Sequence, residues 1–180
     1  MNTNDELIYR VRDLKRRHNE LVQSCQKYGT SMTIRVGKIL NEYPHIDEIC
    51  QSLKGKYEYS DEEYMIVAPT GVEDIILEGN ALTHCIANSD RYWDRIENRE
   101  SYILFLRKST DPTKAFYTLE IEPDGTIRQK RSTLNEQYED IEQATGFLLK
   151  WQQVVAKRLT TEDRSLARQS RALRTEEFEQ

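Results

Sequence analysis

Three β-type segments separated by short, turn-rich loops lie between residues 101 and 131, and they restrict the fold more than any other feature. Residues 101–107 form an apolar run rich in β-forming side chains, and residues 115–121 alternate between polar and apolar positions. The third segment, residues 126–130, follows a Pro-Asp-Gly sequence that is a hairpin-turn signal. Short connections between consecutive strands predict an antiparallel meander.

Helical spacing of apolar residues precedes and follows this meander. In the first 28 residues, apolar side chains recur every three or four positions, with Thr3 or Asn4 as the N-cap and Gly29 as the expected stop. The spacing predicts helices at residues 5–28, 34–40, 45–53, 72–82 and 138–159, and a further strand at 64–67. These elements predict an α+β fold, with N-terminal helices, a small antiparallel β-meander and a C-terminal helix packed on the sheet.

Composition divides the chain into three regions. Residues 1–60 are an N-terminal helical region, residues 61–159 hold the α+β core, and residues 160–180 form a charged tail. The hydrophobic fraction of 37% is sufficient for a single core. The tail is almost entirely charged or polar, so we expect it to be a solvated helix or disordered and to carry no core.

Simple counts exclude several classes of protein. No apolar run approaches the roughly 18–20 residues that span a bilayer, and the first residues do not resemble a secretory signal. The three cysteines, at 25, 50 and 85, form no Cys-x-x-Cys pair, which argues against a disulfide framework and a zinc ribbon. We therefore expect a cytoplasmic protein that does not bind a membrane.

The net charge of −5 is unevenly distributed. Residues 51–125 carry 8 basic and 15 acidic side chains, a local charge of −7. No segment is basic enough to indicate a nucleic-acid surface by charge alone. Any phosphate contact must therefore come from local basic groups, such as residues 15–17 or the arginines and lysine of residues 128–131.

Two reactive side chains, His84 and Cys85, are adjacent in an otherwise small and apolar sequence. Neighbours on a helix point about 100° apart, so the pair is poorly suited to act together as a thiolate–imidazole nucleophile. Together with Glu78 and His18 they match no zinc-ligand spacing, and we expect neither a metal nor a cofactor. The structural alternative is that Cys85 is a small buried residue and His84 a core histidine.

A second group of polar residues belongs to the predicted strands and the segment after them. Thr118 and Glu120 share one face of their strand, and Gln129 and Arg131 share one face of the next. If these faces coincide beneath the helix that carries His84, they form a polar pocket. If they do not, they are the solvent face of a one-sided sheet.

The order of these motifs resembles the PcfJ-like family of conjugative plasmids, integrative elements and phages. The resemblance covers residues 64–151 and rests on Ile66-Val67-Ala68-Pro69, Glu78-Gly79 with Leu82 and His84-Cys85, Tyr92, the strand ending at Arg107, Tyr117-Thr118-Leu119-Glu120, Gln129-Lys130-Arg131 and Asn135. The segment with Lys15 and His18 is similar to a helix that precedes this core in the family. Asn19 stands where the family tends to have Asp, and Ser132 and Thr133 stand where a Gly often follows the Arg.

The resemblance implies a protein of DNA transfer or of conflict between element and host, and it favours a real polar pocket. We hypothesise a mobile-element accessory protein whose cleft binds, and in one version cleaves, nucleic acid or a nucleotide. As an enzyme it would be similar to a metal-independent RNase, with His84 as general base or acid and Arg107 and Arg131 facing the phosphate. The remaining assignments are Gln129 and Asn135 to orient substrate, Glu120 to hold the His84 tautomer, and Glu78, Cys85, Thr118 and His18 as binding residues.

Two alternatives use the same residues differently. In the first, the chain is a non-catalytic module whose acidic residues 51–125 mimic nucleic acid and bind a conjugation, relaxosome or host-defence protein. The N-terminal helix and the charged tail are further partner surfaces in that version. In the second, His84 and Cys85 pack inside the core, and Arg107 and Glu120 form a scaffold ion pair.

Overall fold

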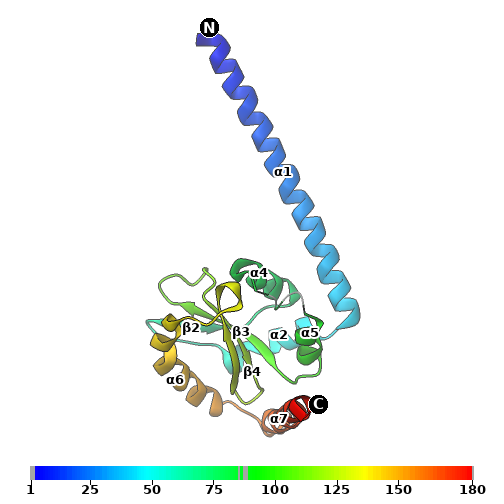
Figure 1. Ribbon diagram of the computed structural model, residues 1–180, viewed down its shortest axis with the longest axis vertical. Helices are drawn as coiled ribbons and strands as arrows, with labels where there is room; N and C mark the ends of the chain where they lie inside the picture. The colour runs from blue at the N-terminus through cyan, green and yellow to red at the C-terminus, as the bar shows by residue number, and fades with distance from the viewer. Residues whose placement is uncertain (1–2, 85, 87–88, 180) are drawn as a thin grey trace. The chain divides into compact units, whose positions relative to one another are not determined.

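The computed structural model describes residues 3–84, 86 and 89–179 (Figure 1). The chain divides into two compact units, Met1–Lys38 and Ile39–Gln180. In the described residues the first unit is helix, and every strand belongs to the second.

Helix α1 (Thr3–Glu42) is continuous and joins the first two predicted helices. The prediction that Gly29 ends the first helix is therefore wrong. A glycine inside a helix costs only about 1 kcal/mol relative to alanine, which is too little to end a helix without a capping turn. The Thr30 hydroxyl also donates a 3.0 Å hydrogen bond to the Gln26 carbonyl one turn earlier, within the same stretch of helix.

The second unit contains a five-stranded sheet whose strands follow chain order and are all antiparallel to their neighbours. The strands are β1 (Tyr59–Ser60), β2 (Tyr64–Val67), β3 (Tyr102–Lys108), β4 (Tyr117–Ile121) and β5 (Ile127–Arg131). The helices are α2 (Ile46–Ser52), α3 (Lys54–Tyr57), α4 (Val72–Leu82), α5 (Asp90–Glu97), α6 (Thr145–Ala156) and α7 (Thr161–Glu179), with 3₁₀ turns η2 (Thr133–Asn135) and η3 (Glu139–Ala144). The predicted α+β fold and its meander are confirmed.

One face of the sheet is apolar, and helix α6, which corresponds to the predicted C-terminal helix, packs on it. Leu104 of β3 pairs with Leu119 of β4 on this face, and both are fully buried. The Phe147 ring of α6 lies 5.6 Å from the Tyr64 ring of β2 on the same side. This contact confirms the predicted packing of the C-terminal helix on the sheet.

The opposite face of the sheet is polar, and helices α4 and α5 contact it. Arg107 of β3 binds Glu78 of α4, and Glu120 of β4 binds Arg95 of α5. These four side chains are buried although all are charged. Because buried charges are stable only when they are paired, ion pairs help to hold this face, beside the buried apolar side chains of Ile103 and Phe105.

Helix α5 was not predicted from the sequence. Its residues are mostly charged, and only Trp93 and Ile96 are both apolar and buried. Two apolar side chains at three-residue spacing are too few for a reliable helical pattern. The helix is fixed by its tertiary contacts with the sheet.

The charged tail forms helix α7, and the expectation that it carries no core is wrong. Ala167 and Ser170 are fully buried. The Ser170 hydroxyl donates to the Glu100 carbonyl over 2.7 Å, and Arg171 binds Glu122 over 2.7 Å. Tertiary ion pairs and hydrogen bonds thus hold a helix that has almost no apolar face.

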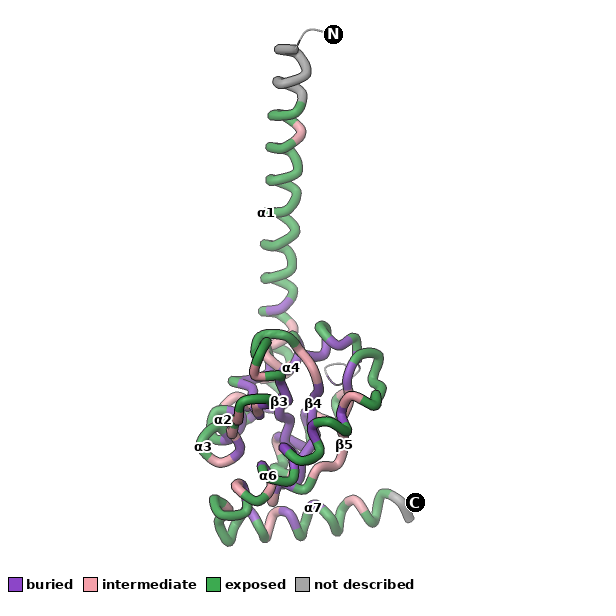
Figure 2. The backbone as a smooth tube through the Cα atoms, turned by 90° about the vertical axis from the view of Figure 1, so that its left-hand side faces the viewer, coloured by how far each residue is buried: buried purple, intermediate pink, exposed green. Residues whose placement is uncertain are grey.

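Burial is concentrated in the centre of the sheet, as Figure 2 shows for β3 and β4. The side chains of residues 10–31 in α1 are almost all exposed. Among the described residues, no helix combines the length and the apolar character needed to cross a membrane.

Candidate functional site

His84 follows helix α4 directly, and the end of that helix fixes its position. The N–H groups of Thr83 and His84 donate to the carbonyls of Asn80 and Gly79 over 3.3 Å and 3.1 Å, which is a Schellman-type ending. Thr83 has a φ of 52°, in the left-handed region. This conformation suits glycine and strains a β-branched residue by about 1–3 kcal/mol.

A second strained turn lies next to α4. In η2, Leu134 has a φ of 58° and Asn135 a φ of 61°, and η2 packs beside α4. Ser132 and Thr133, which depart from the family pattern, come just before these left-handed residues. Because strained backbone concentrates at functional sites, its presence at Thr83 and in η2 marks this region as a candidate site.

The register of β4 and β5 brings four polar side chains together. Thr118 pairs with Arg131, and Glu120 pairs with Gln129. Directly paired residues point to the same side of a sheet, and residues two apart on a strand share a face. The two polar faces predicted from the sequence therefore coincide.

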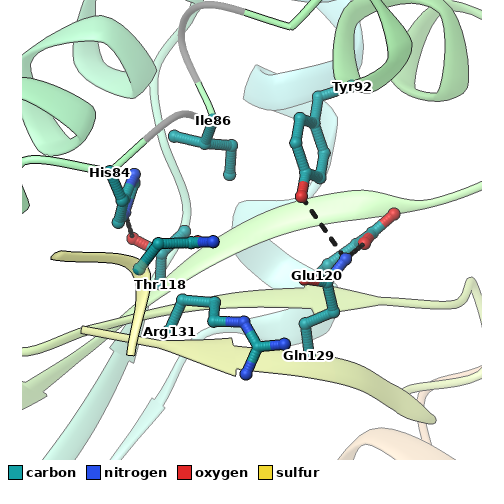
Figure 3. Close-up of a pocket in the computed structure, with 8 residues that line it drawn as sticks. His84, Ile86, Tyr92, Thr118, Glu120, Gln129 and Arg131 are labelled. Atoms are coloured by element: carbon teal, nitrogen blue, oxygen red, sulfur yellow. Dashed lines mark hydrogen bonds between the residues drawn. The ribbon is translucent and has the colours of Figure 1, made fainter. Parts of the chain in front are cut away.

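These residues and His84 line one pocket (Figure 3). Its walls are His84, Ile86, Tyr92, Thr118, Glu120, Gln129, Arg131 and Asn135. His84 is only 6% exposed. The free volume inside is about 10 Å³, which is room for one water molecule.

The two ring nitrogens of His84 have different surroundings. Nε2 lies 2.8 Å from the Thr118 hydroxyl oxygen, whereas the buried Nδ1 has no hydrogen-bond partner among the described residues. Thr118 also lies near Glu78, where it partly opposes the rise in the pKa of that acid. A hydroxyl both donates and accepts, so neutral His84 either donates from Nε2 to Thr118, which leaves a lone pair on Nδ1, or accepts at Nε2, which leaves an N–H on Nδ1.

In the tautomer that donates to Thr118, neutral His84 carries its proton on Nε2 and a lone pair on Nδ1. Burial lowers the pKa of His84 below its ordinary 6.5, although a backbone hydrogen bond partly opposes the shift. The ring is therefore neutral at neutral pH. A neutral imidazole with an unsatisfied lone pair is a hydrogen-bond acceptor and a general base.

Glu78 is held by Arg107 through a buried, two-pronged ion pair. The guanidinium Nη1 and Nη2 atoms donate to the two carboxylate oxygens over 2.7 Å and 2.5 Å. Burial still raises the pKa of Glu78 above its ordinary value, because desolvation outweighs the Arg107 contact.

Glu120 has its own partners and none of them is His84. Its carboxylate accepts from Arg95 over 3.0 Å, from Ser101 over 2.7 Å and from Gln129 over 2.7 Å. Arg128 lies 3.6 Å away as a further ion-pair partner. The prediction that Glu120 holds the His84 tautomer is therefore wrong, because its oxygens are occupied and Thr118 is the residue at Nε2.

Arg131 differs from the other arginines of this face. Within the described part of the chain, no carboxylate forms an ion pair with it, and its buried Nε atom lacks a hydrogen-bond partner. Arg95 and Arg128, by contrast, each contact several acidic groups. Arg131 is thus a cation with unused hydrogen-bond donors in the same pocket as the unpartnered Nδ1 of His84.

A wider groove continues from this pocket. It has a volume of about 420 Å³ and shares Tyr92, Glu120, Gln129 and Arg131 with the pocket. Its other walls are Arg91, Arg95, Arg128, Arg174 and Glu177. Five arginines against two glutamates make the groove positively charged, which suits an anionic ligand.

Comparison with known proteins identifies the family. The sequence profile described as "PcfJ-like protein" matches residues 3–145, from α1 to the start of α6. The chain belongs to the PcfJ-like family.

One curated relative of this PcfJ-like chain is "Uncharacterized protein Lin1253/Lin1744" from Listeria innocua. The two are 33% identical over 86 residues, which cover 47% of this chain and 18% of the relative. The similarity thus spans under a fifth of that protein. No solved structure gives a significant match.

The sequence-predicted residues of the PcfJ-like core divide into three groups. His84, Thr118, Glu120, Gln129, Arg131 and Asn135 line the common pocket. Arg107 and Glu78 line a different groove, of about 490 Å³, so Arg107 does not face the pocket. Cys85 lies outside the described residues, and His18 belongs to the other unit, Met1–Lys38, where its side chain is exposed.

The predicted scaffold pair between Arg107 and Glu120 is also wrong. Glu120 lies opposite Ile103, four residues before Arg107 on β3. At about 3.3 Å per residue, this separation is about 13 Å, too far for an ion pair.

The sequence assigned no role to Ile86 or Arg95 in the PcfJ-like site, and it marked Arg128 only as part of a basic group that could contact phosphate. Tyr92 was visible only as part of the family pattern, and the arginines were indistinguishable from solvated charges. Among the described residues, no group of three His, Cys, Asp or Glu side chains is arranged to hold a metal ion.

Proposed function

We propose that this PcfJ-like domain binds RNA in the groove of about 420 Å³ beside the His84 pocket and cleaves it without a metal ion. One ribose 2′-hydroxyl enters the pocket, whose free volume suits a group of about the size of a water molecule. The observation that carries the proposal is the pairing of two unsatisfied groups in one pocket. His84 Nδ1 and Arg131 Nε both lack a hydrogen-bond partner among the described residues. A ribose 2′-hydroxyl beside its own 3′-phosphate supplies both, because the hydroxyl donates and the phosphate oxygens accept.

The chemistry follows from the neutral state of His84. Nδ1 takes the proton of the 2′-hydroxyl while O2′ attacks the adjacent phosphorus. The bond from phosphorus to O5′ breaks, and the leaving oxygen takes a proton from water. The products are a 2′,3′-cyclic phosphate and a free 5′-hydroxyl. DNA lacks the nucleophile, so the proposal is specific to RNA.

Arg131 has the electrostatic role in this step. A guanidinium donates two parallel hydrogen bonds to phosphate oxygens and balances the charge that develops on the pentavalent phosphorus. Gln129 and Asn135 from the same pocket provide amide contacts that orient the nucleotide. Arg91 and Arg174 of the adjoining groove face the neighbouring phosphates of the strand.

The cellular setting of the proposal comes from the family resemblance. A role in transfer or maintenance of a mobile element is supported by the association of PcfJ-like proteins with such elements. A cytoplasmic location is supported by the free thiols at Cys25, which is exposed, and at Cys50, which is buried, since both suit a reducing compartment.

The test is a cleavage assay on a fluorescent single-stranded RNA in the presence of EDTA. We expect cleavage by the wild-type chain, a 2′,3′-cyclic phosphate end, and no cleavage of the same sequence as DNA. His84→Ala should lower the rate at least about 100-fold. The matched control is His45→Ala, because the exposed His45 contacts Glu97, which is not a wall of the pocket.

Two outcomes would overturn the proposal. Absence of both RNA binding and cleavage in the wild type would return the chain to the class of non-catalytic interaction modules. Loss of the folded state in His84→Ala, measured by circular dichroism, together with normal cleavage in His84→Gln, would make His84 a packing residue.

A further inference from the structure

Helix α1 carries a seam of exposed side chains that recur alternately every three and every four residues. The members of this seam are Val11, Leu14, His18, Leu21, Cys25 and Tyr28. All six are exposed, with Leu14 at 71% and Leu21 at 66% of full exposure. Four of the six are large hydrophobic residues that a solvated helix has no reason to align.

The period of the seam identifies the kind of partner. Alternating steps of three and four average 3.5 residues, whereas a straight α-helix has 3.6 residues per turn. A 3.5-residue seam drifts by about 20° per heptad on a straight helix, and it stays on one side only when two helices supercoil. The partner that fits this seam is therefore another α-helix.

The helix also needs such a partner to be stable. Residues 29–33 include Gly29, Thr30, Ser31 and Thr33, all weak helix formers. Isolated helices are marginal in water, and most helical stability comes from packing of an apolar face. In the unit Met1–Lys38 the described residues form no second element against which the seam packs.

The charge pattern along α1 points to a second copy in the opposite direction. Residues 10–20 carry five basic and two acidic side chains, whereas Lys27 is the single charged residue of 21–31. A parallel pair would place the two basic halves side by side. An antiparallel pair places each basic half against the nearly uncharged half of the other helix, which avoids the repulsion.

We propose that α1 forms an antiparallel two-stranded coiled coil with α1 of a second copy of this chain. In this arrangement, each of the six seam residues faces another seam residue on the second copy. Val11 opposes Tyr28 of the second copy, Leu14 opposes Cys25, and His18 opposes Leu21. In this register the basic Lys15 and Arg17 flank uncharged positions near Val22 and Ser24.

The first test measures the mass of the full-length chain by size-exclusion chromatography with light scattering. The wild type should have twice the 21.3 kDa of one chain. The double variant Leu14→Gln, Leu21→Gln keeps good helix formers but removes half of the large apolar seam residues, and it should be monomeric. Arg16→Gln is the matched control, because Arg16 is exposed on the side of the helix away from the seam.

The second test fixes direction and register by disulfide cross-linking with diamide. Leu14→Cys should form a covalent dimer through Cys25 of the second copy, and the wild type should form none. Adding Cys25→Ser to Leu14→Cys should abolish the cross-link. A monomeric wild type, or a wild-type dimer linked through Cys25 alone, would overturn the proposal, the latter because it requires parallel helices.

Discussion

Arg128 and Arg131 lie three residues apart on β5 and both reach the polar face of the sheet, yet their surroundings are opposite. The Arg128 side chain is 3% exposed and contacts Glu100, Glu122 and Ser170. Arg131 has no such partner among the described residues. A charge that is already paired builds the fold and is costly to detach, whereas an unpaired charge beside a pocket is available to a ligand.

The same contrast separates the two carboxylates of this face from His84. Glu78 and Glu120 accept hydrogen bonds from arginine, serine and glutamine side chains. His84 uses one ring nitrogen for structure and leaves the other unused. The groups proposed to act on RNA thus differ from the structural carboxylates in having unsatisfied hydrogen-bonding capacity, and burial alone does not separate them. Arg95 Nε is also without a hydrogen-bond partner, but the Arg95 guanidinium forms ion pairs with Glu100 and Glu120.

The largest effect on stability is expected when a carboxylate that is paired with buried arginines is removed. Glu120→Ala leaves Arg95 and Arg128 buried without this partner, and we expect the free energy of unfolding to fall by about 3–5 kcal/mol. Urea denaturation followed by circular dichroism measures this. Glu62→Ala, at an exposed position, should change stability by less than about 0.5 kcal/mol. Equal midpoints for the two variants would show that the Glu120 network contributes nothing net to the fold.

Removing the unpaired Arg131 should have the opposite effects, namely lower RNA cleavage and unchanged stability. Arg131→Ala should lower RNA cleavage by about 100- to 1000-fold, as loss of one preorganised donor does at other charge-stabilising sites. Its stability should stay within about 0.5 kcal/mol of the wild type, because no ion pair is broken. The control is Lys130→Ala, which removes a positive charge from the opposite face of the same strand. Similar rates for both variants would assign Arg131 to general electrostatic attraction.

A smaller effect is expected from the residue that orients His84. Thr118→Val keeps the shape of the side chain and removes the hydroxyl, so Nε2 loses its partner and the tautomer is no longer fixed. One hydrogen bond contributes about 0.5–1.5 kcal/mol, so cleavage should fall about 3- to 10-fold. Thr118→Ser should restore most of the rate. A valine variant as active as the wild type would exclude a positioning role for Thr118.

Local sequence patterns predicted the part of the site that depends on strand periodicity. Thr118 and Glu120 share a face because side chains alternate, and the hairpin signal at Pro123 to Gly125 brings the next strand beside them. The pocket members on β4 and β5 followed from these two facts. His84 was found because an imidazole next to a cysteine is chemically unusual.

The ion-pair partners depend on features that a single sequence does not encode locally. The pairing of β4 with β5 shifts after Glu120, so that Ile121 pairs with Ile127 and Arg128 is the extra residue of a β-bulge. This shift breaks the alternation and brings Arg128 to Glu120. Likewise, Arg107 binds Glu78 because α4 crosses β3 at that point, a tertiary contact that no spacing within either segment predicts.

The smallest predicted effect tests the protonation state of His84 without any RNA. Burial lowers the pKa of His84 in the folded chain, whereas the unfolded chain has an ordinary histidine pKa near 6.5. As the pH falls through 6.5, His84 is protonated in the unfolded state but stays neutral in the folded state. The folded state therefore loses stability relative to the unfolded state. Titration of His84 should therefore lower the free energy of unfolding by less than about 1 kcal/mol between pH 8 and pH 6.

The measurement is the difference in urea midpoint between wild type and His84→Gln at each pH. Working above pH 6 keeps the carboxylates outside the comparison, and His18 and His45 are common to both proteins. The advantage of the wild type in urea midpoint should shrink as the pH falls. Only the wild type carries the His84 imidazole, and protonation of that ring favours the unfolded state. If the urea midpoints of the two proteins instead change with pH in parallel, the His84 ring takes up its proton in the folded chain as readily as in the unfolded chain. In that case Nδ1 would be a charged donor below pH 6.5, and the role of general base would be lost there.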